Sequence, residues 1–316
     1  MVGMKSPRLL AGVSGLAALA LLGACATTSS PTVPGTKRVV AAIYPYEWLA
    51  EQIGGDRVTV EGLLPPGGEA HDLELTPQQV ADVTVRGDLI LYESSFQAAV
   101  DSAVGQGTKG TALDVRTLVQ NLDTTESADG HDTETPTDAH DHAADPHLWL
   151  DPTNMVTVAA AVRDRLIALD PDGADAYRAN TDTVTAELRS VDAEYSAGLA
   201  SCDRRGFVTS HEAFGYLAQR YGLQQISIRG LDATVEPTAA RIAEVQDLAK
   251  REGITTIFYE TAVSPAVSQA IARDAGLTTD VLDPLEAKPT DTSRGADYLG
   301  VMRANLQSLR TANGCR

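Results

Sequence analysis

Short apolar segments alternate with helical patterns along most of this chain, and this alternation is the feature that most constrains its fold. It occurs once before residue 100 and again after residue 205. Strands separated by helices form parallel sheets, because a parallel connection has to cross over the sheet. The sequence therefore predicts an α/β fold with two similar lobes and parallel sheets. The expected strands are residues 38–43, 57–64 and 88–92 in the first lobe, and 206–209, 223–228, 254–259 and 278–282 in the second.

The segment between the two series, residues 173–199, contains no proline and carries apolar residues at helical spacing. One continuous helix of this length would extend about 40 Å at roughly 1.5 Å per residue, enough to run along both lobes as a rigid strut. The expected division of the chain is therefore a signal peptide at 1–24, a flexible tether at 25–36, an N-terminal lobe at 37–172, a linker helix at 173–200 and a C-terminal lobe at 201–316.

The N-terminus has the layout of a bacterial lipoprotein signal. Lys5 and Arg8 precede an uncharged apolar run that ends at Leu22, too short for a comfortable membrane-spanning helix. The run leads into Leu-Gly-Ala-Cys, which matches the lipobox and predicts that Cys25 is lipidated and becomes the first residue. An ordinary cleaved signal with an incidental cysteine is the alternative. Both interpretations place the protein outside the cytoplasm, and the first anchors it to the cell membrane.

Charge and cysteine content agree with an exported protein. The formal net charge is −18 at pH 7, which would repel phosphate groups and excludes nucleic acid as a partner. With Cys25 assigned to the anchor, Cys202 and Cys315 remain, and an even pair in an exported chain predicts a disulfide. Two free thiols are the alternative. We expect the protein to be a monomer.

Residues 123–145 have no apolar periodicity and predict a disordered, exposed loop. Three of the six histidines, His131, His140 and His142, lie here among acidic residues. Such a tract can hold divalent metal ions weakly, although a plain solvated linker has the same composition.

The other histidines follow strands or strand-like segments. His71 lies in the loop after residues 57–64, His147 follows Asp145, His211 comes directly after residues 206–210, and Asp283 ends the strand at 278–282. Ligand sites of open α/β sheets form beyond the carboxyl ends of strands, so these residues can converge between the lobes. Taken singly, each has an ordinary interpretation as a hydrogen-bonded loop histidine or a turn-starting aspartate.

Three imidazoles and one carboxylate fill a tetrahedral Zn²⁺ shell, and they favour Zn²⁺ over the harder Mn²⁺. A zinc hydrolase is the alternative, because three histidines with an open fourth position describe catalytic zinc. Asp283 would close that position. Glu212 is the best candidate for a general base, but we interpret it as a residue that opens the helix after His211.

Five stretches of the sequence resemble the zinc and manganese solute-binding proteins of bacterial ABC importers, and the resemblance covers nearly all of residues 37–316. They are Gly68-Glu69-Ala70-His71 with Thr76-Pro77, residues 145–152 around His147, residues 210–216 around His211, Glu236-Pro237-Thr238, and Leu282-Asp283-Pro284-Leu285.

The resemblance implies two lobes joined by one long helix and a metal ion buried between them on His71, His147, His211 and Asp283. It implies a non-enzymatic subunit that delivers zinc to an ABC permease and its ATPase. Manganese members of this family usually carry a carboxylate at the position of His211, so the histidine there indicates zinc. A manganese-binding subunit, or an extracellular zinc chaperone or adhesin on the same fold, is the alternative. The first motif departs from many relatives in the residues on both sides of His71.

Overall fold

The computed structural model describes residues 35–122, 145–262 and 264–316, together with Met1 and Gly3. Cys25, His131, His140 and His142 lie outside the described residues. Among the described helices, none combines the length and the apolar character that a membrane span requires.

The first lobe is built on a parallel four-stranded sheet in the order β2-β1-β3-β4. In its central strands, residues 39–41 of β1 and 89–91 of β3 are buried, as expected for a parallel sheet covered by helices on both faces. The elements of this lobe are β1 (Lys37–Ala41), α1 (Tyr44–Gly54), β2 (Val58–Gly62), α2 (Pro77–Ala81), β3 (Leu89–Tyr92), α3 (Ala98–Gly105), β4 (Thr111–Asp114) and α4 (Pro152–Leu169).

The second lobe repeats this topology with a parallel sheet in the order β6-β5-β7-β8. In both sheets the chain begins in an inner strand, moves outward and then crosses to the other side. The elements are β5 (Gly206–Thr209), α6 (Gly215–Tyr221), β6 (Gln224–Ser227), α7 (Ala239–Arg251), β7 (Thr256–Tyr259), α8 (Ala266–Ala275), β8 (Thr278–Val281) and α9 (Tyr298–Asn313). The prediction of two α/β lobes with parallel sheets is confirmed.

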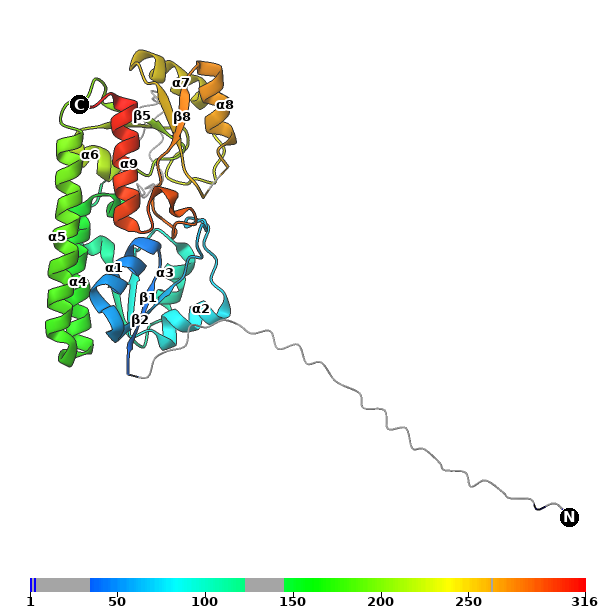
Figure 1. Cartoon of the computed structure of the whole chain (residues 1–316), viewed down its shortest axis with the longest axis vertical. Coiled ribbons are helices and arrows are strands. Elements are labelled where there is room, and N and C mark those ends of the chain that lie inside the picture. Colours follow the sequence, from blue (N-terminus) through cyan, green and yellow to red (C-terminus); the bar gives the residue numbers. More distant parts are fainter. Residues whose placement is uncertain (2, 4–34, 123–144, 263) are drawn as a thin grey trace, which may run out of the picture. The chain divides into compact units, whose positions relative to one another are not determined.

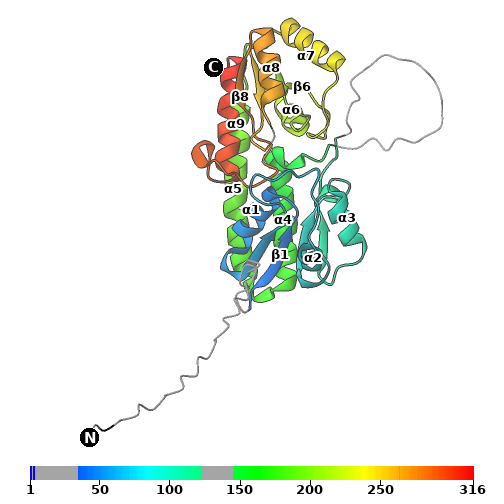
Figure 2. The same ribbon diagram turned by 90° about the vertical axis from the view of Figure 1, so that its right-hand side faces the viewer.

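The long helix α5 (Ala174–Gly198) packs against both lobes. Figures 1 and 2 show it beside α4 along the first lobe and reaching α9 of the second. Asn180 donates a hydrogen bond to the carbonyl of Ile53 at the end of α1, and the Tyr195 hydroxyl donates to the carbonyl of Met302 in α9 at 2.7 Å. The helix therefore ties the two lobes to one element, as the proline-free segment predicted.

A second connection between the lobes runs through Trp149, which is fully buried just before α4. Its indole N–H donates to the carbonyl of Pro284 in the second lobe at 2.7 Å. Its own carbonyl accepts a hydrogen bond from the Tyr298 hydroxyl at 2.6 Å. Because His147 precedes this residue by two positions, these bonds also fix the segment that carries the histidine.

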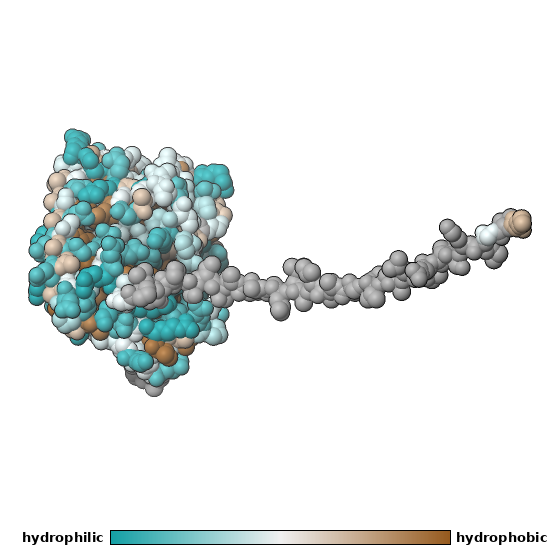
Figure 3. All heavy atoms as spheres, turned by 60° about the horizontal axis from the view of Figure 1, so that its bottom comes forward, coloured by the Kyte–Doolittle hydropathy of each residue, from teal (hydrophilic) through white to brown (hydrophobic). Residues whose placement is uncertain are grey.

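The face of the molecule shown in Figure 3 is largely hydrophilic, with apolar residues in small separate areas. Val85 and Val235 are the large hydrophobic side chains that stay exposed within residues 35–122, 145–262 and 264–316. Neither forms an extended apolar patch of the kind that marks a large protein interface.

Three elements of the first lobe had no counterpart in the sequence prediction: the helix α3, the strand β4 and the 18-residue helix α4. The signal for α4 is nevertheless present. Asp151 precedes Pro152, and its carboxylate caps the helix by accepting from the Thr153 backbone N–H at 2.8 Å.

Cys202 and Cys315 form a disulfide that joins the segment after α5 to the chain end after α9. The two residues also pair through their backbones as an isolated antiparallel bridge. The cross-link closes a loop with a sequence separation of 113 residues. It therefore restricts the whole second lobe in the unfolded chain.

We expect the double substitution Cys202→Ser with Cys315→Ser to lower the free energy of unfolding by about 2–4 kcal/mol, because the unfolded chain regains the entropy that the cross-link removes. Urea titration of the metal-free protein, followed by circular dichroism, measures the difference. The reduced wild-type protein serves as the control and should unfold at the same urea concentration as the variant. Equal midpoints for the variant and the oxidised wild-type protein would contradict the expectation.

Candidate metal centre

Three histidines from both lobes and one glutamate converge on a single point. His71 lies in the loop after β2, His147 in the turn before α4, His211 directly after β5 and Glu286 after β8. Each offers one ligand atom, and the four atoms all lie within 4.8 Å of one another. The carboxyl ends of strands from two separate sheets thus supply one site.

Four of the six distances between the donor atoms fit a tetrahedral metal ion. Glu286 Oε1 lies 3.2 Å from His147 Nε2, 3.3 Å from His211 Nε2 and 3.4 Å from His71 Nε2. The Nε2 atoms of His147 and His211 are 3.4 Å apart. Nitrogen and oxygen ligands about 2.0–2.1 Å from a zinc ion at tetrahedral corners are separated by about 3.4 Å. The four measured edges therefore match the separations that Zn²⁺ imposes.

The site is buried, and one of its donors has no hydrogen bond. His147, His211 and Glu286 are 0%, 1% and 3% exposed. His71 Nε2 is also shielded from solvent and makes no hydrogen bond within the described part of the chain, although Glu286 is near. A buried polar atom without a partner is costly, and a metal ion at the centre would satisfy it.

Two carboxylates outside the cluster orient two of the imidazoles. Asp145 Oδ1 lies 2.8 Å from His147 Nδ1 and also accepts the backbone N–H of His147 at 2.8 Å. Glu260, at the end of β7, lies 2.8 Å from His211 Nδ1 and accepts a hydrogen bond from the Ser210 hydroxyl. Such carboxylates hold the proton on Nδ1, so that Nε2 faces the metal, and they make the imidazole a stronger donor.

The loop around His71 is held differently, by contacts to the turn after β3. Gln97 donates a side-chain hydrogen bond to the carbonyl of Ala70 at 3.1 Å, and the ring of Phe96 meets the His71 ring edge-on at 5.0 Å between centroids. Glu69 accepts the backbone N–H of His71 at 3.1 Å. These contacts fix the loop in the absence of a helix or strand.

The surrounding charges shift the protonation of the cluster. Burial alone would lower the pKa of His147, but its bonds to Asp145 and Glu286 outweigh burial and raise it to about 9. Burial acts in the same direction on His211, and there Glu260 and Glu286 raise the pKa to about 10. Burial would raise the pKa of Glu286, but the three imidazoles hold it well below its usual range.

Asp283, the carboxylate that the sequence suggested as the fourth ligand, does not join this cluster, and Glu286 stands in that place. The Asp283 carboxylate accepts hydrogen bonds from the Thr261 hydroxyl at 3.0 Å and from the backbone N–H of Leu285 at 2.8 Å. The expectation took the first carboxylate after the strand. In the structure a turn follows Asp283, and the first acidic side chain that reaches the imidazoles is Glu286. The only sequence signal for this ligand was the presence of a second acidic residue three positions after Asp283.

Glu212 also lies outside the cluster. It borders a cavity of about 240 Å³ together with Arg229, Arg241 and Glu236. Burial raises the pKa of its carboxyl group, and the neighbouring Asp145 raises it further. Glu212 is therefore not one of the four converging donors, although it is the next residue after His211.

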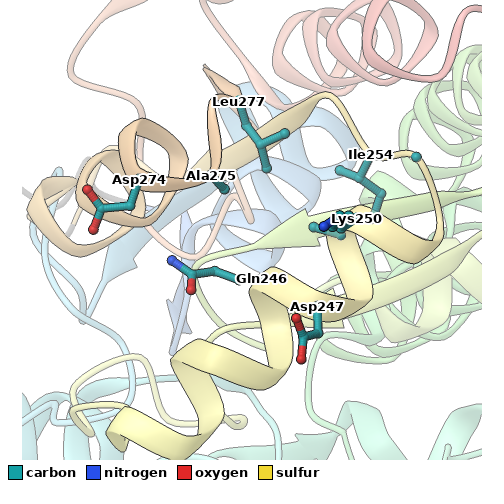
Figure 4. A pocket seen from close by; sticks show the side chains of 9 residues that line it. Gln246, Asp247, Lys250, Ile254, Asp274, Ala275 and Leu277 are labelled. Atoms are coloured by element: carbon teal, nitrogen blue, oxygen red, sulfur yellow. The ribbon is translucent and has the colours of Figure 1, made fainter.

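A larger cavity, of about 540 Å³, lies between α7 and α8 in the second lobe (Figure 4). Asp247, Lys250 and Asp274 lie at its edge, and Ile254 and Leu277 supply apolar walls. Its lining includes none of the four clustered donors. The candidate metal ligands therefore lie at the histidine cluster and not at this larger cavity.

Comparisons with known proteins also point to zinc. Residues 39–312 match the family described as zinc-uptake complex component A, periplasmic. The chain is 32% identical to the zinc-binding lipoprotein AdcA of Streptococcus pneumoniae strain R6 over 93% of its own length and 59% of the relative. It is 31% identical to the high-affinity zinc uptake system protein ZnuA of Bacillus subtilis, covering 92% of this chain and 93% of that protein. The chain thus spans about three fifths of the streptococcal AdcA relatives.

Solved structures show the same fold. The Zn(II)-bound ZnuA-like domain of Streptococcus pneumoniae AdcA matches with a TM-score of 0.73 and 31% identity, over 88% of this chain and 99% of that one. The laminin-binding protein of Streptococcus agalactiae, described as having adhesin and metal-transporting activity, matches with a TM-score of 0.75 and 28% identity, over 87% and 99%.

We expect zinc binding to release about two protons at pH 7, because the metal takes only neutral imidazoles and the raised pKa values keep His147 and His211 protonated in the metal-free site. The apparent affinity should rise with pH, by up to about 100-fold per unit, and level off only above pH ~10. Calorimetry in buffers with different ionisation enthalpies counts the protons, and a count near zero would contradict the expectation.

The raised pKa values of His147 and His211 also make the stability of the metal-free protein depend on pH. A histidine whose pKa is raised on folding stabilises the protein fully below its unfolded value of about 6.5, and this contribution disappears as the pH rises through the folded value. For His147 and His211 the loss falls between about pH 6.5 and the folded values of about 9 and about 10.

Proposed function

The chain belongs to the family of periplasmic zinc-uptake components, and from this premise we propose that it is the extracytoplasmic zinc-binding subunit of an ABC-type importer. Its substrate is Zn²⁺, held by His71, His147, His211 and Glu286. The observation that supports this most strongly is the spacing of the four donor atoms, with edges of 3.2 to 3.4 Å around Glu286 Oε1 and the imidazole nitrogens.

The donor set favours zinc over manganese. Three imidazoles and one carboxylate provide nitrogen-rich, four-coordinate binding, whereas Mn²⁺ prefers more oxygen ligands and a larger coordination number. Four donors converge here, so a tetrahedral zinc ion held by all of them would have no open position for the water molecule that a zinc hydrolase activates. Capture and release of the ion is therefore the function we assign, and no catalytic role.

The partners in this proposal are a membrane permease and its ATPase, with the protein tethered to the cell membrane through lipidated Cys25. The lobes would extend over residues 37–172 and 201–316, joined by the helix at 173–200. A second function, adhesion to a host surface, is favoured by one observation: a structural relative carries both adhesin and metal-transporting activity.

We expect His147→Ala, His211→Ala and Glu286→Gln each to weaken zinc binding at least about tenfold, because each removes one of four inner-sphere bonds. Titration against a competing chelator measures the dissociation constant, and metal analysis of protein purified without added metal identifies the ion. Glu236→Gln is the matched control, since that side chain is 77% exposed. Near-native affinity in two of the three site variants would disprove the assignment.

Transport itself requires a test in cells. In a zinc-starved strain that lacks the protein, the wild-type chain should restore uptake of radioactive zinc, and the chain with both His147→Ala and His211→Ala should not. If zinc is bound but uptake is unchanged when the permease is also deleted, the protein is a chaperone or adhesin and not an importer subunit.

The His-rich segment stays a separate prediction. Deleting residues 127–144 should leave the tight zinc site intact and remove weaker binding by His131, His140 and His142, because the composition of this segment predicts ligands that are not preorganised, and such ligands lose more entropy when they bind. Calorimetry on both proteins separates the two classes of binding. A single identical event in both would reduce the segment to a linker.

A further inference from the structure

Glu286 is presented by a turn whose backbone is unusual. It follows β8, and the preceding residue, Leu285, has a φ of 61°. A residue with a branched, bulky side chain rarely adopts this left-handed conformation, and it persists only where the surroundings hold it. Leu285 is also fully buried. Some feature of the fold must therefore keep the turn in a shape that the chain alone would not choose.

The Asp283 side chain is that feature. Its Oδ1 accepts the backbone N–H of Leu285 at 2.8 Å, which closes a turn across Pro284. Its Oδ2 accepts the hydroxyl of Thr261 at 3.0 Å. The carboxylate thus links the residue just before Glu286 to the end of β7.

The main chain of Asp283 is held as firmly as its side chain. Asn305, fully buried in α9, accepts the backbone N–H of Asp283 at 3.0 Å and donates to its carbonyl at 2.7 Å. On the other side of the turn, the carbonyl of Glu286 accepts the backbone N–H of Tyr44 at 3.1 Å. Both ends of the four-residue turn are therefore fixed, and the Asp283 carboxylate sets the path between them.

We propose that Asp283 is a positioning residue for metal capture, whose carboxylate shapes the turn so that Glu286 Oε1 meets the three imidazoles. This inference rests on the proposed function, because it assigns the metal-binding role to Glu286. It also explains why the Asp283 carboxylate, only three residues before Glu286, bonds to Thr261 and Leu285 and not to the imidazoles.

The end of β7 also positions a second metal donor, His211. Glu260 precedes Thr261, and its carboxylate holds the His211 ring at 2.8 Å. Two adjacent residues at the end of β7 thus orient two different donors, His211 directly and Glu286 through Asp283. A displacement of the turn would change the distances from Glu286 to all three imidazoles at once.

Substitutions at 283 separate positioning from ligation. Asp283→Asn keeps an Oδ1 acceptor for the Leu285 N–H but removes the negative charge, so zinc affinity should stay within about threefold of wild type. Asp283→Ala removes the acceptor and should weaken zinc binding about tenfold or more. The matched control is Asp280→Ala, because Asp280 on β8 also accepts a backbone N–H, from Val281, without touching the turn.

Bound Co²⁺ provides a readout that loss of stability alone would not change. Its visible absorption is strong in four-coordinate sites and weak when water adds to the shell. We expect Asp283→Asn to keep the strong spectrum of the wild-type protein and Asp283→Ala to lose intensity, as Glu286→Gln does. If Asp283→Ala does not fold, as judged by circular dichroism, Thr261→Val tests the same turn and should weaken zinc binding two- to fivefold.

The outcomes distinguish this inference from the function on which it rests. If Asp283→Asn loses as much affinity as Glu286→Gln, Asp283 acts by charge or as a ligand, and the positioning role is overturned. If Asp283→Ala binds like wild type while Glu286→Gln is impaired, only the positioning role fails. If the wild-type protein itself does not bind zinc, the proposed function fails first.

Discussion

The packing of three imidazoles against one buried carboxylate is the interaction on which the rest of this structure depends. Asp145 and Glu260 lie behind the imidazoles, so the interior holds three carboxylates around a small volume. Buried charges are tolerated only when they are paired and hydrogen-bonded. Two imidazolium protons or one Zn²⁺ can supply the same positive charge, and the site is therefore suited to exchange one for the other without a change in buried charge.

The fold makes this arrangement possible because each lobe directs the carboxyl ends of its strands toward the other. Helix α5 and the bonds of Trp149 to Pro284 and Tyr298 hold the two lobes together, so that the strand ends of both sheets stay next to the site. Preorganisation of this kind reduces the ordering cost of binding, which is what a high-affinity site requires.

The sequence predicted the lobes, the long helix and three of the four converging residues because those features depend on local patterns. Apolar strands, a proline-free helical stretch and histidines at strand ends can each be recognised within a few residues. The choice between Asp283 and Glu286 could not be made in this way. It depends on Asn305, Thr261 and a left-handed Leu285, and these come together only through tertiary structure.

The position of the Glu286 segment also connects ligand geometry to the relation between the lobes. The segment follows β8 of the second lobe, yet its backbone is bonded to the first: Tyr44 binds the carbonyl of Glu286, and Gly67 donates to the carbonyl of Lys288 at 3.2 Å. Lys288 also pairs with Glu47 of α1 at 3.1 Å. Any separation of the lobes has to break these bonds or pull Glu286 away from His211. The contacts that join the lobes and the carboxylate that completes the four-donor cluster therefore lie in one short segment, directly after the strained backbone of Leu285.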